Sequence, residues 1–285
     1  MAIFLMSAHR SMTEYQWKSF DGLDIYAVQW PSVETPEAVV VFVHGHGDHC
    51  RRYDEWFSKL TVRNIAVLTF DYRGHGRSQG KQGVIKKYGD LIQDVTLLHK
   101  KALLLFPGIP IVMYGHSLGA TIVLSYILRS TLLPQLAIAS SPWLKLNRHP
   151  GKMLSALIKA GNVVTPCMTF KTGLHSSDFS NMEGYTEKRE KDNFVHNMIS
   201  PRLFSEVEKE VAWIMIHFKE IETPLLLMQG RDDQIMDGTA TQKLYDGSPG
   251  QVNYREWKYA GHQLHNSERS NEVMDFITDW IKEGI

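Results

Sequence analysis

Five short apolar runs, separated by segments with helical periodicity, set the strongest limit on how this chain can fold. Each run is apolar at almost every position, which is typical of parallel strands that helices cover on both faces. Between the runs, apolar residues recur every three or four positions over 88–106 and 117–129, and again over 271–281, as in amphipathic helices. This alternation predicts an α/β fold with a mostly parallel sheet. The five runs are 39–43, 65–70, 111–114, 136–139 and 225–228.

Two segments depart from this alternation. Asp21-Gly22 lies between two strand-like segments and predicts an N-terminal hairpin. No strand pattern recurs from 142 to 218, whereas 153–160 and 205–218 have helical periodicity and 172–189 is polar, as in a loop. We therefore predict a largely helical insertion between two strands. The predicted division is an N-terminal tail at 1–12, a core at 13–141 and 219–285, and a cap at 142–218.

Composition and charge narrow the class of protein. The chain has 285 residues, of which 43% are hydrophobic and 22% charged, as in globular proteins that bury a full core. Lys plus Arg equals Asp plus Glu at 31 each, so no broad basic field is available to recruit nucleic acid. Cys50 and Cys167 are too few and too far apart for a disulfide framework, which fits a reducing cytoplasm. The apolar start at 1–6 lacks the basic residues of a signal peptide, and no run is long enough to span a bilayer.

The sequence Gly115-His116-Ser117-Leu118-Gly119 directly follows a predicted strand and opens a predicted helix. The pattern G-x-S-x-G also occurs by chance, and the alternative is a serine N-cap with glycines for close packing. In this context, however, the pattern is typical of a nucleophilic serine on a sharp strand-to-helix turn. The glycines relieve crowding around a strained backbone, and the helix N-terminus favours developing negative charge. We therefore predict that Ser117 is a nucleophile.

A nucleophilic serine needs a base, and the base needs a carboxylate that orients it. In hydrolases built on such a sheet, the acid and then the histidine follow the serine, each after a strand. The sequence offers carboxylates after the run at 225–228 and histidines after a strand predicted at 252–257. We prefer Asp233 and His262, although the chemistry of the residues alone does not separate Asp232 from Asp233. The full set of candidates is Asp232, Asp233 and, more distantly, Asp237 for the acid, and His262 or His265 for the base.

A histidine-rich turn, His44-Gly45-His46-Gly47-Asp48-His49, follows the first apolar run. Glycine in such a turn lets the backbone approach a substrate closely and aim an N–H at its carbonyl oxygen. The alternative is a metal site, but the histidines lie on a glycine turn and no further Asp or His cluster completes the ligand set. We therefore predict an oxyanion-binding loop without a metal.

Together these motifs resemble the monoacylglycerol lipase and lysophospholipase group of the α/β-hydrolases. The resemblance implies the α/β-hydrolase fold, in which helices flank a mostly parallel central sheet. It also implies that the insertion at 142–218 is the cap, which in such lipases is apolar and forms the entrance for the acyl chain. The motifs that carry the resemblance are HGHGDH (44–49), FDYRGHGRSQG (70–80), GHSLG (115–119), QGRDD (229–233) and GHQLH (261–265).

The resemblance assigns roles that the residue chemistry left open. It implies that Asp233 is the catalytic acid and His262 the base. It implies that the backbone N–H groups of His46 and Leu118 form the oxyanion hole. His46 is also a departure, because these lipases often have a smaller residue there, and its bulk affects the width of the pocket. A further motif is mainly structural in this group and is expected to hold the loops near the nucleophile: Asp71, Arg73 and His75.

The activity implied by the resemblance is hydrolysis of a carboxylic ester of monoacylglycerol or lysophospholipid through an acyl-enzyme, with no cofactor. An apolar cap over a polar triad suits a substrate with an apolar tail and a polar head, and it is compatible with transient contact with a membrane surface. The alternatives are a carboxylesterase or thioesterase of small acyl substrates, and a non-catalytic binding protein of the same fold. We expect a cytoplasmic enzyme, and the sequence predicts no particular oligomeric state.

Overall fold

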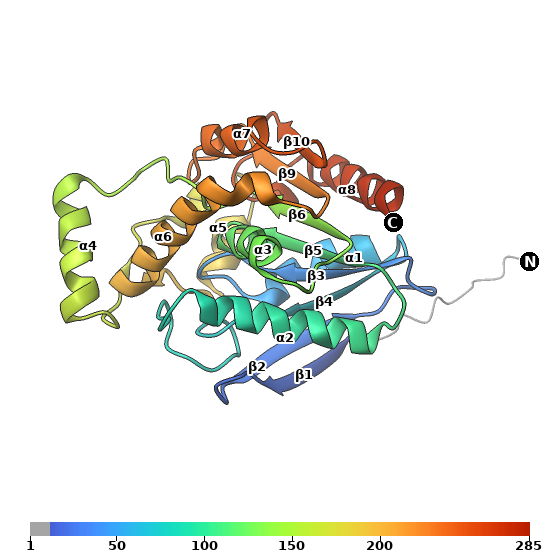
Figure 1. Ribbon diagram of the computed structural model, residues 1–285, viewed down its shortest axis with the longest axis horizontal. Helices are drawn as coiled ribbons and strands as arrows, with labels where there is room; N and C mark the ends of the chain where they lie inside the picture. Colours follow the sequence, from blue (N-terminus) through green and yellow to red (C-terminus); the bar gives the residue numbers. More distant parts are fainter. Residues whose placement is uncertain (1–11) are drawn as a thin grey trace, which may run out of the picture.

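The computed structural model describes residues 12–285, so the predicted tail lies outside the described residues except for Met12. The central sheet consists of β1 (Thr13–Lys18), β2 (Asp24–Trp30), β3 (Ala38–Val43), β4 (Ile65–Phe70), β5 (Ile111–His116), β6 (Leu136–Ser140), β9 (Leu225–Gly230) and β10 (Val252–Trp257). Its strand order is β1-β2-β4-β3-β5-β6-β9-β10 (Figure 1). All pairs from β4 to β10 are parallel, while β1 and β2 pair antiparallel with each other and β2 pairs antiparallel with β4. The predicted α/β fold and N-terminal hairpin are confirmed.

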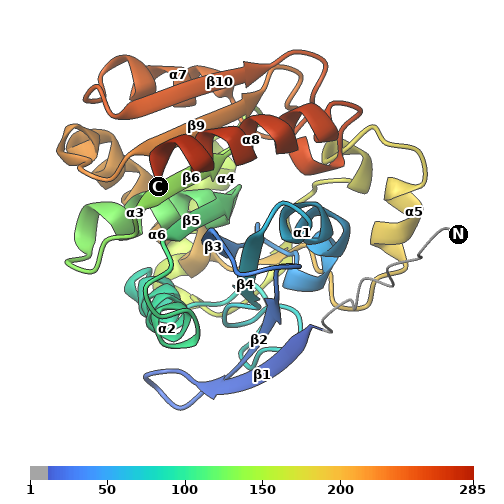
Figure 2. The ribbon, with the colours of Figure 1, turned by 90° about the vertical axis from the view of Figure 1, so that its right-hand side faces the viewer.

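Helices cover both faces of the sheet, as Figure 2 shows end-on. On one face lie α2 (Gly89–Leu105) and α3 (Leu118–Arg129), and on the other lie α1 (Asp54–Thr61) and α8 (Ser270–Gly284). Strand β3 illustrates why a continuous apolar run is needed. Val39, Val41 and Val43 enter the core under α2 and α3, while Ala38, Val40 and Phe42 enter the core under α1 and α8. Burial on both faces therefore requires an apolar side chain at every position.

The cap connects β6 to β9 and contains α4 (Lys152–Val164), α5 (Tyr185–Glu190) and α6 (Pro201–His217). In Figure 1, α4 lies at the left, away from the sheet, and α6 runs from the cap towards α3. Two of our expectations for this segment were wrong. It contains a short antiparallel pair, β7 (Phe170–Lys171) with β8 (Met198–Ile199), and the expected loop at 172–189 contains the start of α5. A two-residue strand shows no periodicity, and α5 is a single polar turn and a half, so neither has an apolar pattern to detect.

Two helices of the core were not predicted, α1 and α7 (Gly238–Asp246), the latter lying beside β9 and β10. Residues 12–285 include no helix that is both long and apolar enough to cross a membrane. The carboxyl ends of β5, β9 and β10 point to the same edge of the parallel sheet, below the cap. The predicted site residues follow these strand ends, so the topology alone brings them together.

Candidate active site

Ser117, His262 and Asp233 form one hydrogen-bonded line at the carboxyl edge of the sheet. The hydroxyl of Ser117 lies 3.0 Å from Nε2 of His262, and Nδ1 of His262 lies 2.8 Å from Oδ2 of Asp233. The three residues follow β5, β10 and β9 respectively, and each is at most 6% exposed. This arrangement has the geometry in which an imidazole accepts a proton from a serine hydroxyl while a carboxylate orients the ring.

The backbone at Ser117 is strained, and its neighbours explain the glycines. Ser117 has φ 56° and ψ −120°, a conformation that non-glycine residues rarely adopt. A Cβ on Gly115 would lie 2.3 Å from the carbonyl oxygen of Gly119, and a Cβ on Gly119 would lie 2.1 Å from that of Val43. Both glycines are therefore required for the close contact between β5, the start of α3 and β3.

The carboxylate that meets His262 belongs to Asp233. Its Oδ1 accepts the backbone N–H groups of Ile235 and Met236, each at 2.9 Å. Asp232 is exposed and its side chain makes no contact with the triad in the described part of the chain. Asp237 instead caps the N-terminus of α7, and the Lys145 ammonium beside it lowers the pKa of its carboxyl to about 2. The structure thus brings only the preferred carboxylate to the histidine.

His265, the alternative base, lies behind the triad. Its ring packs against Tyr53 at 4.6 Å and against His116 at 5.1 Å between centroids. Burial lowers the pKa of His265 to about 3, so its ring is neutral at physiological pH. The backbone of His262 is fixed by a hydrogen bond, because the hydroxyl of Ser141 donates to the His262 carbonyl oxygen at 2.8 Å. His265 therefore packs beside the base, and the structure does not bring it to Ser117.

The two residues predicted to supply the oxyanion donors lie close to Ser117. Leu118 is the first residue of α3, and His46 lies on the loop that follows β3. This loop runs tightly against the serine, since a Cβ on Gly45 would lie 3.2 Å from Cβ of Ser117. Across residues 12–285, the backbone N–H groups of His46 and Leu118 have no protein acceptor. Both remain available to an oxyanion, and their role stays a prediction.

The partly buried side chain of His46 packs against three buried rings at the site. It packs edge-to-face against His75 and His196, at 5.5 Å and 5.4 Å, and against Trp143 at 6.3 Å. Burial lowers the pKa of His46 to about 3 and that of His196 to about 4, so both rings are neutral at physiological pH. Among the described residues, no group of three or more His, Cys, Asp or Glu side chains is placed to hold a metal.

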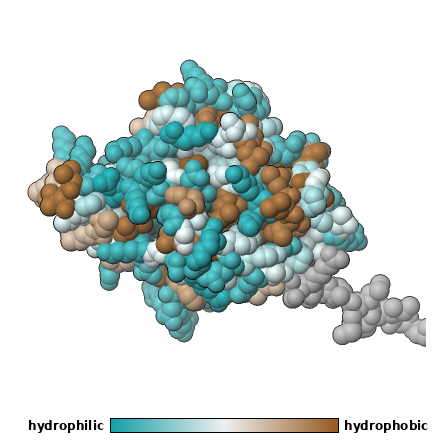
Figure 3. Space-filling model, turned by 60° about the horizontal axis from the view of Figure 1, so that its bottom comes forward, coloured by the Kyte–Doolittle hydropathy of each residue, from teal (hydrophilic) through white to brown (hydrophobic). Residues whose placement is uncertain are grey.

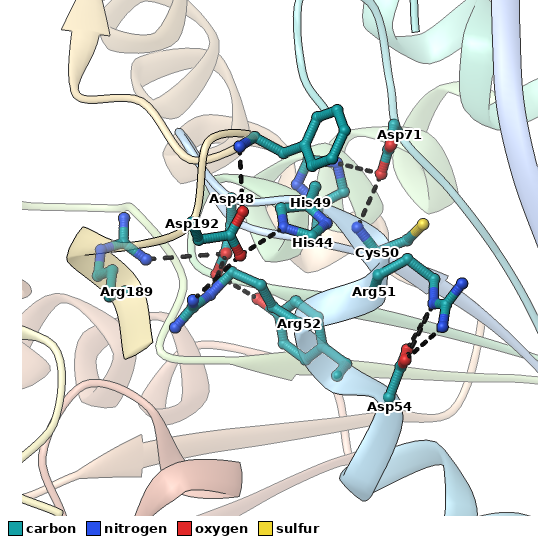
Figure 4. A network of polar contacts seen from close by, with 12 residues as sticks. His44, Asp48, His49, Cys50, Arg51, Arg52, Asp54, Asp71, Arg189 and Asp192 are labelled. Carbon is teal, nitrogen blue, oxygen red and sulfur yellow. Dashed lines mark hydrogen bonds and ion pairs between the residues drawn. The ribbon is translucent and has the colours of Figure 1, made fainter. Parts of the chain in front are cut away.

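The segment that was expected to be structural contacts the chain just after the histidine-rich loop. Asp71 accepts the backbone N–H of Cys50 at 2.7 Å (Figure 4). It also accepts the backbone N–H of Arg77 at 2.8 Å. Arg73 pairs with Asp94 at 2.7 Å, beneath α2. His75, as described above, packs against the ring of His46. Asp71 thus fixes the start of the 3-10 turn that follows the histidine-rich loop.

A polar network that the sequence did not reveal joins this loop to the cap. Asp48 pairs with Arg52 at 2.8 Å and lies 3.7 Å from Arg189 of α5, while His49 pairs with Asp192 at 2.9 Å (Figure 4). The backbone also takes part, because the N–H of residue 196 donates to the carbonyl oxygen of residue 47 at 2.9 Å. The contacts to Arg189, Asp192 and residue 196 join positions more than 130 residues apart along the chain, so no local pattern signals them.

A cavity of about 550 Å³ opens above Ser117 and His262. This volume lies in the range of sites that enclose a small molecule. Part of its polar lining comes from the end of α5 and the segment that leads to β8, and includes Arg189, Glu190, Asp192, His196 and Asn197. Its apolar lining comes from the cap and the loop after β6, and these side chains share one hydrophobic cluster: Trp143, Leu146, Ile158, Phe170, Ile199 and Phe204.

The fold and this site define the class of α/β-hydrolases with a serine nucleophile motif. A family model described as "Serine aminopeptidase, S33" matches residues 34–269, and the chain belongs to this family. The monoglyceride lipase of Rattus norvegicus is 28% identical over 93% of this chain and 89% of that protein.

Two further comparisons support this placement. An abhydrolase domain-containing protein of Dictyostelium discoideum is 30% identical over 90% of this chain, which spans 27% of that protein's length. Among solved structures, the monoacylglycerol lipase of Paleococcus ferrophilus is 26% identical with a TM-score of 0.83, covering 92% of this chain and 99% of that one. The chain is an ester-hydrolysing enzyme similar to the monoacylglycerol lipases.

Proposed function

We propose that this enzyme hydrolyses the carboxylic ester of monoacylglycerol through an acyl-enzyme. Ser117 attacks the ester carbonyl while His262 accepts its proton, and Asp233 stabilises the resulting imidazolium. The N–H groups of His46 and Leu118 stabilise the oxyanion of the tetrahedral intermediate. Glycerol leaves with the proton from His262, and water then attacks the acyl-enzyme with the same histidine as base. The bond between Ser117 and the acyl group breaks, the fatty acid leaves, and His262 returns the proton of the water to the hydroxyl of Ser117.

The observation that carries this proposal is the two-sided lining of the cavity around the triad. The apolar side offers a surface to an acyl chain, whose burial contributes about 0.8 kcal/mol per methylene. The polar side offers neutral rings and amides to the hydroxyls of a head group. Ser117 and His262 line the same cavity, so an ester bond between tail and head can lie at the nucleophile.

A panel of esters tests the proposal directly. We expect kcat/KM to rise from p-nitrophenyl acetate towards long-chain p-nitrophenyl esters, and long-chain monoacylglycerol to be hydrolysed efficiently. A protein with Ser117→Ala serves as the blank for background hydrolysis. A preference for acetate or butyrate would favour a carboxylesterase of small substrates and overturn the lipase assignment.

Lysophospholipid is a second candidate substrate, because two cations without an ion-pair partner among the described residues also line the cavity. These are Arg148 and Lys171, which could contact a phosphate. The carboxylates of Asp178, Glu190 and Asp192 line it as well and would repel an anion. Comparing lysophosphatidylcholine with monoacylglycerol of the same acyl chain separates the two. Faster hydrolysis of the lysophospholipid would make it the substrate.

His46 is predicted to limit the size of the alcohol that the site accepts. Its ring lines the cavity beside Ser117 and is fixed by its three ring neighbours. Replacing His46 with alanine should therefore raise kcat/KM for esters of bulky alcohols, relative to methyl esters, by roughly tenfold. Acyl-chain preference should not change, because the apolar side chains that line the cavity remain. The matched control is His175→Ala, an exposed cap histidine, and an unchanged ratio in the His46 variant would contradict the prediction.

We also propose that α4 contacts a membrane surface. Figure 3 shows apolar side chains gathered at the left, over the cap, and Met153, Leu157 and Val163 of α4 are exposed. Replacing these three with serine should lower hydrolysis of monoacylglycerol in phospholipid vesicles, roughly tenfold, by removing apolar area that the membrane would bury. Hydrolysis of a water-soluble p-nitrophenyl ester should not change. Equal activity of both proteins on vesicles would exclude the contact.

A further inference from the structure

Gln229 lies directly behind the carboxylate of Asp233 and takes no part in the mechanism above. It occupies β9 near its end and is 1% exposed. Its Nε2 donates to Oδ2 of Asp233 at 2.9 Å, the same oxygen that accepts Nδ1 of His262 at 2.8 Å. A single carboxylate oxygen is therefore shared between the histidine and this amide.

Thr241 fixes which way the Gln229 amide faces. Its hydroxyl, in the first turn of α7, donates to Oε1 of Gln229 at 3.1 Å, and Thr241 is fully buried. An ionised carboxylate only accepts hydrogen bonds, so the NH₂ end of Gln229 must face Asp233. The oxygen end must then face a donor, and Thr241 supplies it. The close fit extends to Gly238, where a Cβ would lie 2.9 Å from Cγ of Gln229.

Gln229 completes the set of donors around the carboxylate. An ionised carboxylate offers about four acceptor positions. At Asp233, Ile235 and Met236 fill two on Oδ1 from the backbone, and His262 fills one on Oδ2. Gln229 fills the fourth, and it is the side chain outside the triad that does so. Without it, His262 is the only partner of Oδ2 among residues 12–285, and the two bonds on Oδ1 alone must keep the carboxylate on the line to Ser117.

We propose that Gln229, braced by Thr241, is a positioning residue that holds Oδ2 of the catalytic acid on the line to His262. The inference rests on the proposed function, because it requires Asp233 to act as the acid. Gln229 is absent from the lining of the cavity and acts through Asp233. Its loss should therefore slow the chemical steps and leave substrate binding unchanged.

The first test is Gln229→Leu, which keeps the approximate volume and removes the amide. We expect kcat to fall about 10- to 100-fold, the range for losing a hydrogen bond to a charged group, with KM within about twofold of wild type. A rise in KM at unchanged kcat, or no change in either, would overturn the proposal. Gln242→Ala is the control, because this neighbour of Thr241 bonds only to Asp246 at 2.7 Å among the described residues.

The second test uses Thr241, whose variants keep the packing of α7. Thr241→Val has nearly the same shape but no hydroxyl, and we expect kcat to fall about threefold to tenfold. Thr241→Ser retains the donor and should restore kcat, a rescue that a purely structural role does not predict. These two variants decide the question even if Gln229→Leu does not fold. Equal activity of the valine and serine variants would contradict the proposal that the Thr241 hydroxyl holds the amide of Gln229.

The third test asks whether the two residues act as a unit. Because Thr241 works through Gln229, the double variant Gln229→Leu/Thr241→Val should be no slower than Gln229→Leu alone. Additive losses would show independent roles and contradict the proposal. Asp233→Asn separates this inference from the proposed function. Full activity of Asp233→Asn would show that Asp233 is not the catalytic acid and would contradict the proposed function. An inactive Asp233→Asn together with a fully active Gln229→Leu would contradict only the positioning role of Gln229.

Discussion

Replacing Ser117 with alanine is expected to abolish turnover, with kcat falling on the order of a millionfold. In the proposed mechanism this hydroxyl forms the acyl bond, and the cavity holds no other hydroxyl within hydrogen-bonding distance of His262 among the described residues. Substrate affinity should persist, because the lining of the cavity is unchanged. The measurements are steady-state hydrolysis of a long-chain monoacylglycerol and covalent labelling by a fluorophosphonate probe.

Ser125→Ala is the matched control for this variant. Ser125 lies two turns further along the same helix, is also buried, and contacts Glu210 away from the triad. Its loss should cost about 1.5–3 kcal/mol of stability, the range for a hydrogen bond to a charged group. It should leave kcat within about twofold of wild type, because Ser125 contacts Glu210 and not the triad. Labelling and turnover by the Ser117→Ala protein at wild-type rates would show that another residue is the nucleophile.

The core of the fold could be predicted from the sequence because its signals are local. A parallel strand covered on both faces must be apolar throughout, and each predicted run coincides with a strand of the sheet. The two helices that sequence patterns missed have weaker signals. Helix α1 has eight residues with three buried apolar side chains, and α7 buries only Thr241 and Leu244. Helices this short place too few apolar residues on one face to establish a period.

The site could be predicted in part, for a related reason. A strand followed by G-x-S-x-G is a local pattern, and the order of acid and base follows from the topology of the sheet. The choice between Asp232 and Asp233 is not local. It depends on the turn at Ile235 and Met236, whose N–H groups point at one carboxylate, and on the approach of His262. The contacts of Asp48 and Gln229 likewise need the folded chain.

Replacing Asp233 with asparagine should lower kcat by about ten-thousandfold, although the two side chains have the same shape. The physical reason lies in the donors around the carboxylate. The N–H groups of Ile235 and Met236 are fixed in the backbone and donate to Oδ1, so the amide oxygen of the asparagine takes that position. Its NH₂ group then takes the position of Oδ2, where it faces both the amide of Gln229 and Nδ1 of His262. Nδ1 of His262 then faces a donor, and it must accept.

The proton of the His262 imidazole would consequently move to Nε2, the atom that lies 3.0 Å from the hydroxyl of Ser117. A protonated Nε2 cannot accept the serine proton, so the nucleophile is not activated even though every residue remains in place.

Asp232→Asn is the matched control, because it makes the same substitution at the adjacent, exposed position and should leave kcat within about twofold of wild type. Equal losses in the two variants, or a larger loss in Asp232→Asn, would contradict the assignment of Asp233 as the catalytic acid. The large difference expected between neighbouring aspartates follows from the single carboxylate that the folded chain turns towards the histidine.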